Sequence, residues 1–403
     1  MCPILSATHR NKVGAALIGL QIAVTLAVLC NASFIIQQRL DEVARPSGTD
    51  EADLFAITND WFSTGSDAAG RTGNDLTALR AIPGVMGAYV TNSYPLTNSG
   101  SSDGLSIRPD QPPAARTAVY DGDQEALQTL GLRLLAGRAF TAADIVDRTA
   151  FNHPLPDGLI VTQALARALF PTGQALGRRI YFESNTRTTP IIGIVARLQA
   201  PWVSAGFAKA FIDNSTLVPF RYVADRSYYV VRAKPGRLAD VMQAAAQRLV
   251  QTDSDRVIEK VEPFSAARTR AYRDDRGLAV ILAIVCAVLL IVMACSIVGL
   301  TSYWVTQRRR QIGIRRALGA TRPAIVRYFQ TENLLIAGAG VIVGSGFAVA
   351  ASLWMVSRLA MPRLDERYLI AGAAIMLALG QLALLWPALR AASVPPAEAT
   401  RTV

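Results

Sequence analysis

Histidine and cysteine are scarce in this chain of 403 residues, which contains two histidines and four cysteines. With only His9 and His153, a histidine-based catalytic triad or a multi-histidine metal site is not credible. Because no cysteine falls within residues 39–276, no disulfide framework stabilises that long region. We interpret the cysteines as small apolar residues rather than metal ligands or redox groups; they are Cys2, Cys30, Cys286 and Cys295.

A phosphate-binding loop is also missing. The pattern G-x-x-x-x-G-K-[ST] does not occur and no glycine is followed by lysine, so the chain does not cradle ATP phosphates in the usual way. Carboxylates are common within residues 39–276, but no spacing singles out a catalytic pair. We therefore expect a non-catalytic chain with no cofactor of its own.

Charged side chains are absent from four long apolar windows, in a chain that is 51% hydrophobic with a mean hydropathy of +0.27. A helix needs about 20 residues to cross roughly 30 Å of hydrocarbon, and each window is long enough. We predict transmembrane helices at residues 13–38, 277–307, 333–357 and 368–389. An ion-coupled carrier usually needs a charged group at mid-membrane, so this class of transporter is disfavoured.

The arginines predict the orientation of these spans. Seven arginines and no acidic residue lie within residues 308–328, between the second and third windows. By the positive-inside rule, the segment 308–332 and both termini (1–12 and 390–403) are cytoplasmic. Region 39–276 and the turn 358–367 are then extracytoplasmic. The net charge of +11 is explained by this topology and by anionic lipids more simply than by nucleic acid.

A cleaved signal peptide is the alternative interpretation of the first window. The basic start fits it, but the apolar run is longer than the roughly 7–15 residues usual for a signal core. Cleavage would leave three spans.

Region 39–276 alternates predicted strands and helices and is long enough for two subdomains. The segment Asn98–Pro113 is rich in Ser, Gly and Pro and predicts a loop. The predicted fold class is an α-helical membrane protein with four transmembrane helices and a large α+β extracytoplasmic domain between the first and second spans. The predicted strands include Val85–Thr91, Leu159–Thr162, Arg179–Phe182, Ile191–Ala196, Tyr228–Ala233 and Val257–Val261, and the predicted helices include Gln163–Phe170 and Leu238–Gln251.

Two further features concern helix contacts. Gln37–Val43 and Ser265–Arg276 can extend the first two spans outward as a stalk, with Ser265 as a helix cap, or can simply be helix ends held at the interface. Gly340 and Gly344 form a G-x-x-x-G pair on one face of the third span, which allows close helix packing.

The segment RRRQIGIRRALGAT resembles the signature of the FtsX-like, MacB-type permease family, R-x-x-E-I-G-I-R-x-A-L-G-A, with Gln311 in place of the usual Glu. The ending from Pro387 to Ala399 is similar to that family's P-A-x-R-A-A and P-x-E-A patterns. Gly137-Arg138-Ala139-Phe140 and residues 160–169 and 191–195 resemble the MacB-type periplasmic core domain. Residues 40–113 show the weakest likeness.

The resemblance implies a dimeric permease, made of identical or paralogous chains, in a bacterial inner membrane. It implies a separate ABC-type ATPase that binds ATP–Mg, and mechanotransmission of its movements to the periplasmic domain. The work would be efflux or export from the periplasm, with a periplasmic adaptor and an outer-membrane channel as further partners. The residues expected to dock the ATPase are Arg310, Ile312, Gly313, Ile314, Arg315, Arg316, Leu318, Gly319 and Arg322.

Other interpretations remain open. The arginine segment can be a basic helix held by lipid headgroups, which does not exclude docking. The chain can be a membrane-anchored sensor or regulator, for example of cell-wall hydrolases or lipoprotein release, without transport of its own. A membrane enzyme is the third class, but no converging nucleophile and base is evident in the sequence.

Overall fold

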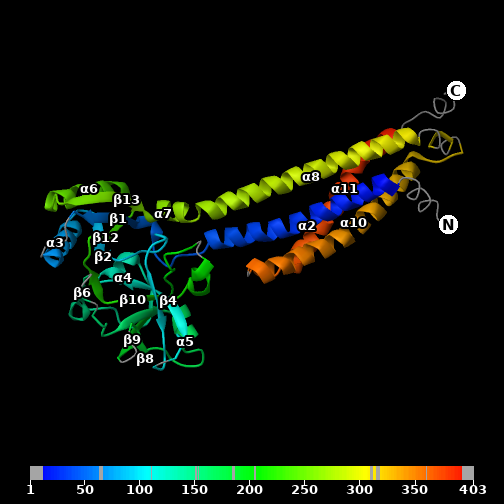
Figure 1. Ribbon diagram of the computed structural model, residues 1–403. Coiled ribbons are helices and arrows are strands. Elements are labelled where there is room, and N and C mark those ends of the chain that lie inside the picture. The colour runs from blue at the N-terminus through cyan, green and yellow to red at the C-terminus, as the bar shows by residue number, and fades with distance from the viewer. Residues whose placement is uncertain are drawn as a thin grey trace. The chain divides into compact units, whose positions relative to one another are not determined.

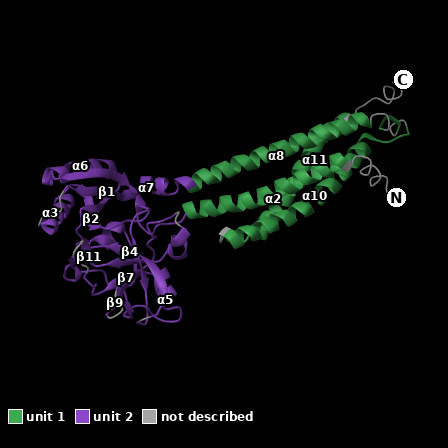
Figure 2. Ribbon diagram, in the orientation of Figure 1, with its two compact units in different colours: residues 1–43, 275–403 green, residues 44–274 purple. Residues whose placement is uncertain are grey.

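The chain divides into two compact units, residues 1–43 with 275–403, and residues 44–274 (Figure 2). The second unit is called the inserted domain below, because its chain runs between the first two apolar helices. The computed structural model describes residues 12–62, 67–109, 111–149, 152, 154–183, 187–203, 206–308, 312–314, 318–359 and 361–392.

Four long helices form the described part of the first unit, and each is long and apolar enough to cross a membrane (Figure 1). The four predicted apolar windows lie within them, but α10 begins at Arg322, well before the predicted window. The second half of the segment 308–332 is therefore the first part of α10. The helices are α2 (Lys12–Val43), α8 (Arg273–Gln307), α10 (Arg322–Leu359) and α11 (Glu366–Ala392).

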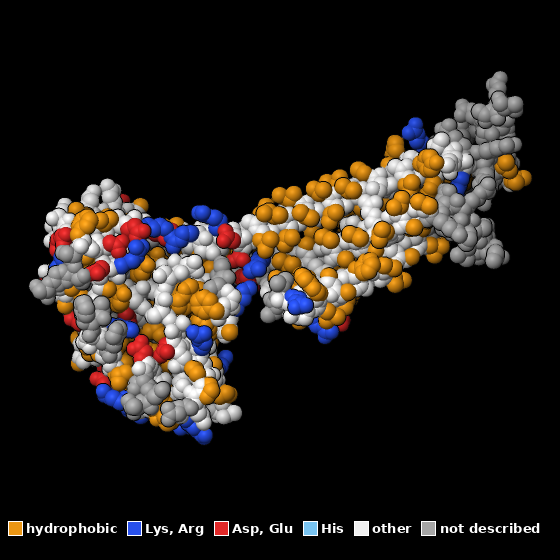
Figure 3. Space-filling model, viewed as in Figure 1, with side chains coloured by type: hydrophobic (Ala, Val, Ile, Leu, Met, Phe, Trp, Pro, Cys, Tyr) orange, Lys and Arg blue, Asp and Glu red, His pale blue; other side chains and the backbone are white. Residues whose placement is uncertain are grey.

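The apolar side chains of this unit point both inward and outward. The inner set forms one core in which α10 packs along α2 and α11. Many outward side chains are also apolar, as Figure 3 shows over the helices, and Ile342 of α10 is 75% exposed. An apolar surface of this kind is solvated better by lipid than by water. The core residues include Ile22, Leu26, Met293, Ile297, Ala337, Ala348 and Met376.

The first sheet of the inserted domain has the strand order β13-β1-β12-β2 with all neighbours antiparallel. Helix α3 connects β1 to β2 and helix α6 connects β12 to β13, which is the arrangement of two split β-α-β units. The second subdomain is inserted between β2 and β12. The elements are β1 (Leu54–Trp61), α3 (Ala68–Arg80), β2 (Val85–Thr91), β12 (Arg226–Ala233), α6 (Leu238–Thr252) and β13 (Arg256–Pro263).

Both faces of this sheet are buried, because successive residues of a strand point to opposite sides. In β1, Phe55 and Ile57 pack under α3 and α6, whereas Leu54 and Ala56 face the second subdomain. The two subdomains therefore share one apolar core. This explains the apolar run at the start of β1 and the buried run within β12.

The second sheet has the strand order β3-β4-β10-β7-β9-β5, with β8 paired to β9. Its strands are β3 (Ser101–Leu105), β4 (Ala115–Asp121), β5 (Leu134–Gly137), β7 (Leu159–Thr162), β8 (Arg179–Tyr181), β9 (Thr188–Val195) and β10 (Ser215–Val218). A separate pair joins β6 (Val146–Arg148) to β11 (Phe220–Tyr222). The helical elements are α4 (Ala126–Leu130), α5 (Gln163–Leu169), η1 (Glu51–Asp53), η2 (Ala142–Asp144), η3 (Gly206–Phe211) and α7 (Phe264–Ala271).

The predicted fold class is confirmed, and so are most of the predicted strands. Strands β2 and β7 have the predicted bounds, and the predicted pairing of Arg179–Phe182 with Ile191–Ala196 is the antiparallel pair β8–β9. The loop predicted at Asn98–Pro113 was wrong in part, because Ser101–Leu105 is β3, paired with β4. Pairing with a strong neighbouring strand overrides the low strand propensity of its Ser, Asp and Gly.

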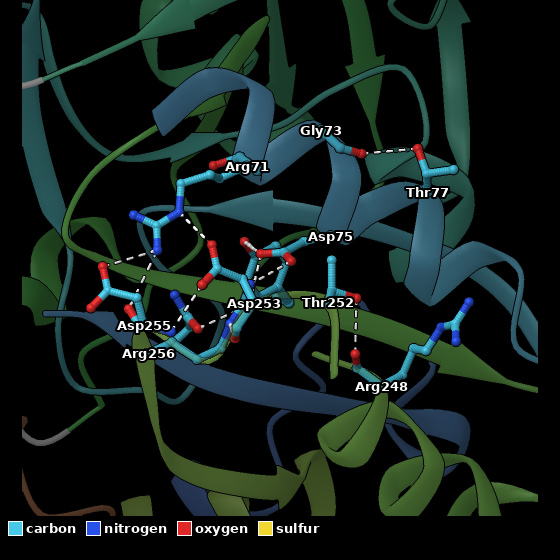
Figure 4. A network of polar contacts seen from close by, with 12 residues as sticks. Arg71, Gly73, Asp75, Thr77, Arg248, Thr252, Asp253, Asp255 and Arg256 are labelled. Carbon is cyan, nitrogen blue, oxygen red and sulfur yellow. Dashed lines mark hydrogen bonds and ion pairs between the residues drawn. The ribbon is translucent and has the colours of Figure 1, made fainter. Parts of the chain in front are cut away.

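A buried ion pair fixes α3 on the first sheet (Figure 4). Arg256 of β13 donates from Nη1 and Nη2 to the two carboxylate oxygens of Asp75, each at 2.7 Å, and neither side chain is exposed. The Tyr229 hydroxyl donates to the same carboxylate at 2.5 Å. Beside it, the Trp61 ring lies between the guanidinium groups of Arg71 and Arg256, at 3.8 and 4.0 Å. The pair of buried charges is therefore satisfied by hydrogen bonds.

The connections to the apolar helices differ from one another. Helix α2 continues without a break through Gln37–Val43. Helices α7 and α8 are separated by the single residue Tyr272. The predicted cap at Ser265 was wrong: α7 begins at Phe264, after Pro263. Ser265 lies inside the helix, where its carbonyl accepts a bond from the Thr269 hydroxyl at 3.0 Å.

Candidate functional site

The candidate site is the segment that joins α8 to α10. Helical hydrogen bonding continues past the end of α8, from the Arg308 amide to the Trp304 carbonyl at 3.0 Å and from the Ile312 amide to the Arg308 carbonyl at 2.9 Å. Residues 312–314 are helical, and the Leu318 amide donates to the Ile314 carbonyl at 3.0 Å. The described part of this segment is therefore a compact helical connection.

An ion pair closes this connection. Arg308 Nη1 donates to both carboxylate oxygens of Glu332 on α10, at 3.2 and 2.9 Å. The Glu332 side chain is only 4% exposed and that of Arg308 is 15% exposed. A charge-assisted bond in such a place is stronger than one in water. It holds the end of α8 against the third turn of α10.

Apolar packing supports the same connection from inside. Ile312 is buried against the first turns of α10 and the last turns of α11. A cavity of about 190 Å³ remains beside it, next to Arg308 and Tyr328. The segment is thereby fixed to two helices of the apolar unit. The cluster consists of Val305, Ile312, Ile325, Phe329, Leu384 and Ala388.

The opposite side of the segment presents apolar side chains outward. Leu318 is 82% exposed and Ile314 is 47% exposed. Gly319 has φ +94°, a left-handed conformation that other residues adopt only at a cost, and it ends the turn before α10. Arg322, the first residue of α10, is also exposed. The structure therefore separates the segment into a packed residue, Ile312, and an outward face of leucine, isoleucine and arginine.

The structure describes some of the predicted docking residues but not all of them. Ile312, Gly313, Ile314, Leu318, Gly319 and Arg322 belong to this segment. Arg310, Arg315 and Arg316 lie outside the described residues, as does His153. The pairing of Arg308 with Glu332 was missed by the sequence reasoning. The signal was present, because Arg308 directly follows the second apolar window and Glu332 directly precedes the third.

The glycine pair of α10 lies against α2 of the same chain. A Cβ on Gly340 would stand 2.8 Å from the Gly19 carbonyl oxygen, and one on Gly344 would stand 2.7 Å from that of Ala23. The backbones of α2 and α10 therefore approach at these positions as closely as glycine permits.

A second ion pair joins the other ends of α2 and α8. Arg39 Nη1 donates to Asp275 Oδ1 at 2.9 Å, and to Glu42 Oε2 at 3.0 Å. The Asp275 side chain is 8% exposed. This pair was also missed from the sequence, in which Arg39 directly follows the first apolar window and Asp275 lies two residues before the start of the second.

Within the inserted domain, burial strongly perturbs the carboxyl group of Asp121. Asp121 ends β4, is fully buried and accepts a bond from Arg148 Nη1 at 3.3 Å. Burial raises the pKa of Asp121 from 3.8 to about 7, although the Arg148 guanidinium acts in the opposite direction. Glu183, which also pairs with Arg148, raises this pKa further. The described residues contain no group of three or more His, Cys, Asp and Glu side chains that could hold a metal ion.

Two family models match the chain and together cover most of it. Residues 15–249 match the MacB-like periplasmic core domain, which is more than half of the chain. Residues 283–396 match the FtsX-like permease C-terminal family. The second match includes the whole candidate site.

Relatives found by sequence are named as permeases or as proteins that contain a permease part. "Uncharacterized ABC transporter permease YvrN" of Bacillus subtilis is 24% identical over 303 residues, which are 70% of this chain and 69% of that one. "Macrolide export ATP-binding/permease protein MacB" of Chromobacterium violaceum is 25% identical over 254 residues, 58% of this chain and 34% of that one. This chain thus spans about a third of the MacB relative. The periplasmic region of MacB from Actinobacillus actinomycetemcomitans covers 58% of this chain and 97% of its own, with 14% identity and a TM-score of 0.36.

Proposed function

This chain belongs to the MacB/FtsX type of ABC transporter permease, and we propose that it couples ATP hydrolysis in a separate ATPase subunit to movements of the inserted domain. The chain supplies no catalytic group and binds no cofactor; ATP–Mg is held by the partner. The observation that carries this proposal is the outward face of the α8–α10 segment, where Leu318 is 82% exposed beside a fixed, packed residue.

The candidate site has the properties that a docking site for a soluble subunit needs. An exposed leucine and isoleucine offer apolar area, and the arginines of the segment offer charge to acidic groups of the partner. Arg308–Glu332 and the Ile312 cluster attach the segment to α10 and α11. A push on Leu318 therefore moves these helices rather than only bending a loop.

Contacts within the first unit then carry the movement onward. Helix α10 meets α2 through Gly340 and Gly344, and α2 meets α8 through Arg39–Asp275. Both α2 and α8 lead into the inserted domain. We infer that tilting of α10 reaches the inserted domain by this route, which supports mechanotransmission without passage of cargo through the bundle.

The location and the task follow from the same proposal. The arginine-rich segment and both termini face the cytoplasm of a bacterial inner membrane, and the inserted domain faces the periplasm. Two copies, identical or paralogous, pair in the membrane. The task is efflux or export from the periplasm, together with an adaptor and an outer-membrane channel.

The first test is copurification of the tagged full chain in mild detergent, with identification of its companions by mass spectrometry. We expect an ABC-type ATPase in near-equal amount. Absence of an ATPase from an intact, dimeric preparation would contradict the proposal and favour a sensor or regulator.

The second test measures stimulation of the ATPase in reconstituted vesicles. Leu318→Ala removes a side chain that contacts the partner, and a buried leucine contributes about 1.5–3 kcal/mol, so the partner concentration for half stimulation should rise about tenfold or more. Leu382→Ala is the matched control, because Leu382 is a 63% exposed leucine in the apolar part of α11. If the two variants had equal effects on ATPase stimulation, Leu318 would not belong to the docking site.

A further inference from the structure

Strand β5 is an open edge of the second sheet in the inserted domain. Among the residues that the structure describes, it pairs on one side only, with β9. The other end of the sheet is partly closed, because Ser106, directly after β3, exchanges backbone bonds with Tyr181 of β8 at 3.2 and 2.8 Å. A free strand edge is a template for another strand. The second sheet can therefore accept a further strand beside β5.

The unused backbone groups of β5 follow from its bonds to β9. The Arg133 carbonyl accepts from the amide that directly follows β9, at 2.9 Å, and the Arg138 amide donates to a β9 carbonyl at 3.0 Å. In a trans peptide, the C=O of one residue and the N–H of the next point in opposite directions. The Leu134 amide and the Gly137 carbonyl therefore point away from β9. They offer one donor and one acceptor to a neighbouring chain.

The side chains of β5 do not oppose such pairing. Edge strands that have to stay unpaired commonly carry a charged residue or a proline. Strand β5 reads Leu-Leu-Ala-Gly, and Leu134 and Leu135 are 36% and 40% exposed. The strand is short and has a bulge at Leu135, which limits the number of backbone bonds. Tight binding at this edge therefore needs side-chain contacts as well.

A pocket lies beside this edge, on the face of the sheet against which α5 packs. Its volume is about 320 Å³, and its apolar lining includes Leu135, Ala136, Phe170 and Ile194. Leu176, also in the lining, is 38% exposed. An added strand points alternate side chains to this face. One of them would therefore enter an apolar pocket.

Three exposed arginines surround the pocket. Arg167 of α5 belongs to its lining, and the Arg178 guanidinium lies 5.8 Å from the centre of the Phe170 ring. Arg133 directly precedes β5, and the register of β5 on β9 places it on the same face as Ile194. Among the described residues, none of the three arginines forms an ion pair. The border of the pocket therefore favours carboxylates.

We propose that β5 and this pocket form a docking site for an extended acidic segment of another protein, which adds to the second sheet as a strand. The backbone of the segment bonds to the Leu134 amide and the Gly137 carbonyl. On the face of α5, its side chains follow the pattern acid–x–apolar–x–acid. The apolar side chain fills the pocket, and the carboxylates pair with the arginines. This site is separate from the α8–α10 segment and does not rest on the proposed function.

A second copy of this chain fits the edge less well. Pairing of β5 with β5 about a twofold axis would bring the arginines of both copies to one interface, and like charges that face each other destabilise a sheet. Pairing of β5 with the β3 edge of the next copy would be head-to-tail and would leave a free edge at each end, which gives open filaments. An acidic segment from a different protein has neither disadvantage.

The test measures binding of a fluorescent peptide to the purified full chain in mild detergent, by fluorescence anisotropy. The probe is Thr-Glu-Thr-Leu-Thr-Glu-Thr, about as long as a typical strand. As a strand, it places two carboxylates and one leucine on the same face. The comparison peptide has lysine in place of both glutamates. We expect saturable binding of the glutamate peptide and at least about tenfold weaker binding of the lysine peptide.

A pair of variants tests the site itself. Arg167→Glu should weaken binding of the glutamate peptide about tenfold, because it reverses a charge at the pocket. Arg248→Glu is the matched control: Arg248 is an exposed arginine of α6 that forms no ion pair among the described residues. This control should change the affinity less than about twofold. Equal effects of the two variants would overturn the proposal, as would absence of binding up to about 1 mM peptide.

Hydrogen exchange then locates the bound peptide. The Leu134 amide should exchange several-fold more slowly when the glutamate peptide is bound, because it gains a backbone acceptor. Unchanged exchange at saturation would place the peptide elsewhere and overturn strand addition. Slow exchange without peptide, which becomes fast on dilution, would assign the edge to a second copy and also overturn the proposal. No ATPase takes part in these measurements, so the proposed function is tested separately.

Discussion

Arg39 and Asp275 form an ion pair at 2.9 Å that joins the ends of α2 and α8 next to the inserted domain. Both side chains are largely buried, at 17% and 8% exposed. The ion pair therefore holds α2 and α8 together at the ends where they leave the apolar unit. Because both helices lead from this pair into the inserted domain, the pair is the first target for mutation.

Breaking this pair should loosen the two helix ends. Asp275→Ala removes the partner of Arg39 on α8 but leaves Glu42 on its own helix, so we expect a loss of about 1–3 kcal/mol. The exchange Arg39→Asp with Asp275→Arg should recover part of the loss. The thermal unfolding midpoint in detergent measures this in a double-mutant cycle. If the loss of stability in the double variant equals the sum of the losses in Arg39→Asp and Asp275→Arg alone, the contact between the two residues contributes nothing specific.

The glycines of α10 allow a test with a control on the same helix. Gly344→Ala places a Cβ 2.7 Å from the Ala23 carbonyl oxygen, which belongs to a backbone and cannot move alone. We expect a loss of about 1–3 kcal/mol as α2 and α10 separate. Gly346→Ala is the control, since no neighbouring atom lies within 4 Å of its added Cβ.

The comparison is made on thermal midpoints of the two purified variants. Gly346→Ala should stay at the wild-type value or rise slightly, because alanine is the better helix former. If both variants unfold at the same temperature, Gly344 is not needed for the close approach of α10 and α2.

The buried pair in the inserted domain should matter much more than an exposed pair nearby. Asp75→Asn leaves the guanidinium of Arg256 without its carboxylate in a fully buried place, which costs about 3–5 kcal/mol. Arg226→Ala, which breaks the exposed pair with Glu259, should cost no more than about 1 kcal/mol. Protection of the β13 amides from hydrogen exchange compares the two variants. Similar protection in both would mean that Asp75 and Arg256 do not anchor α3.

Asp121 predicts an unusual pH dependence of local stability. Its pKa is raised from 3.8 to about 7 by burial, so the folded state binds the proton more tightly than the unfolded state does. Unfolding then releases a proton between these pH values, and the contribution of Asp121 to stability falls as the pH rises from about 4 to about 7 and stays constant above.

The Asp121→Asn variant cannot ionise and lacks this decline. We therefore expect the variant to gain stability relative to wild type as the pH rises through that range. Hydrogen exchange of the β4 amides, divided by the intrinsic exchange rate at each pH, reports this difference. A difference that does not change with pH would show that Asp121 stays charged in the folded protein.

Much of the fold could be predicted because its signals are local. The absence of charge in the windows 13–38 and 277–307 is a property of consecutive residues, and it predicted helices that the structure contains. Strands with continuous apolar runs, such as Leu159–Thr162, were predicted with correct bounds. The strand Ser101–Leu105 was not, because its Ser, Asp and Gly become a strand only through pairing with β4.

The candidate site shows the same limit. The motif around Ile312 to Gly319 identified the segment, but not which side of it packs inward. The sequence contains Ile312 and Ile314 as equivalents, whereas the structure buries the first and exposes the second at 47%. That choice depends on Phe329 and Leu384, which come from two other helices.

By itself, the sequence determined that this chain has four apolar spans, where its arginines gather and which family it belongs to, because these are properties of composition and of short motifs. Only the tertiary structure decided which charges meet. Arg308 meets Glu332, Arg39 meets Asp275 and Arg256 meets Asp75, over separations from 24 to 236 residues. Such pairs depend on how helices and strands pack, and a buried charge accepts only the partner that packing brings within hydrogen-bond distance.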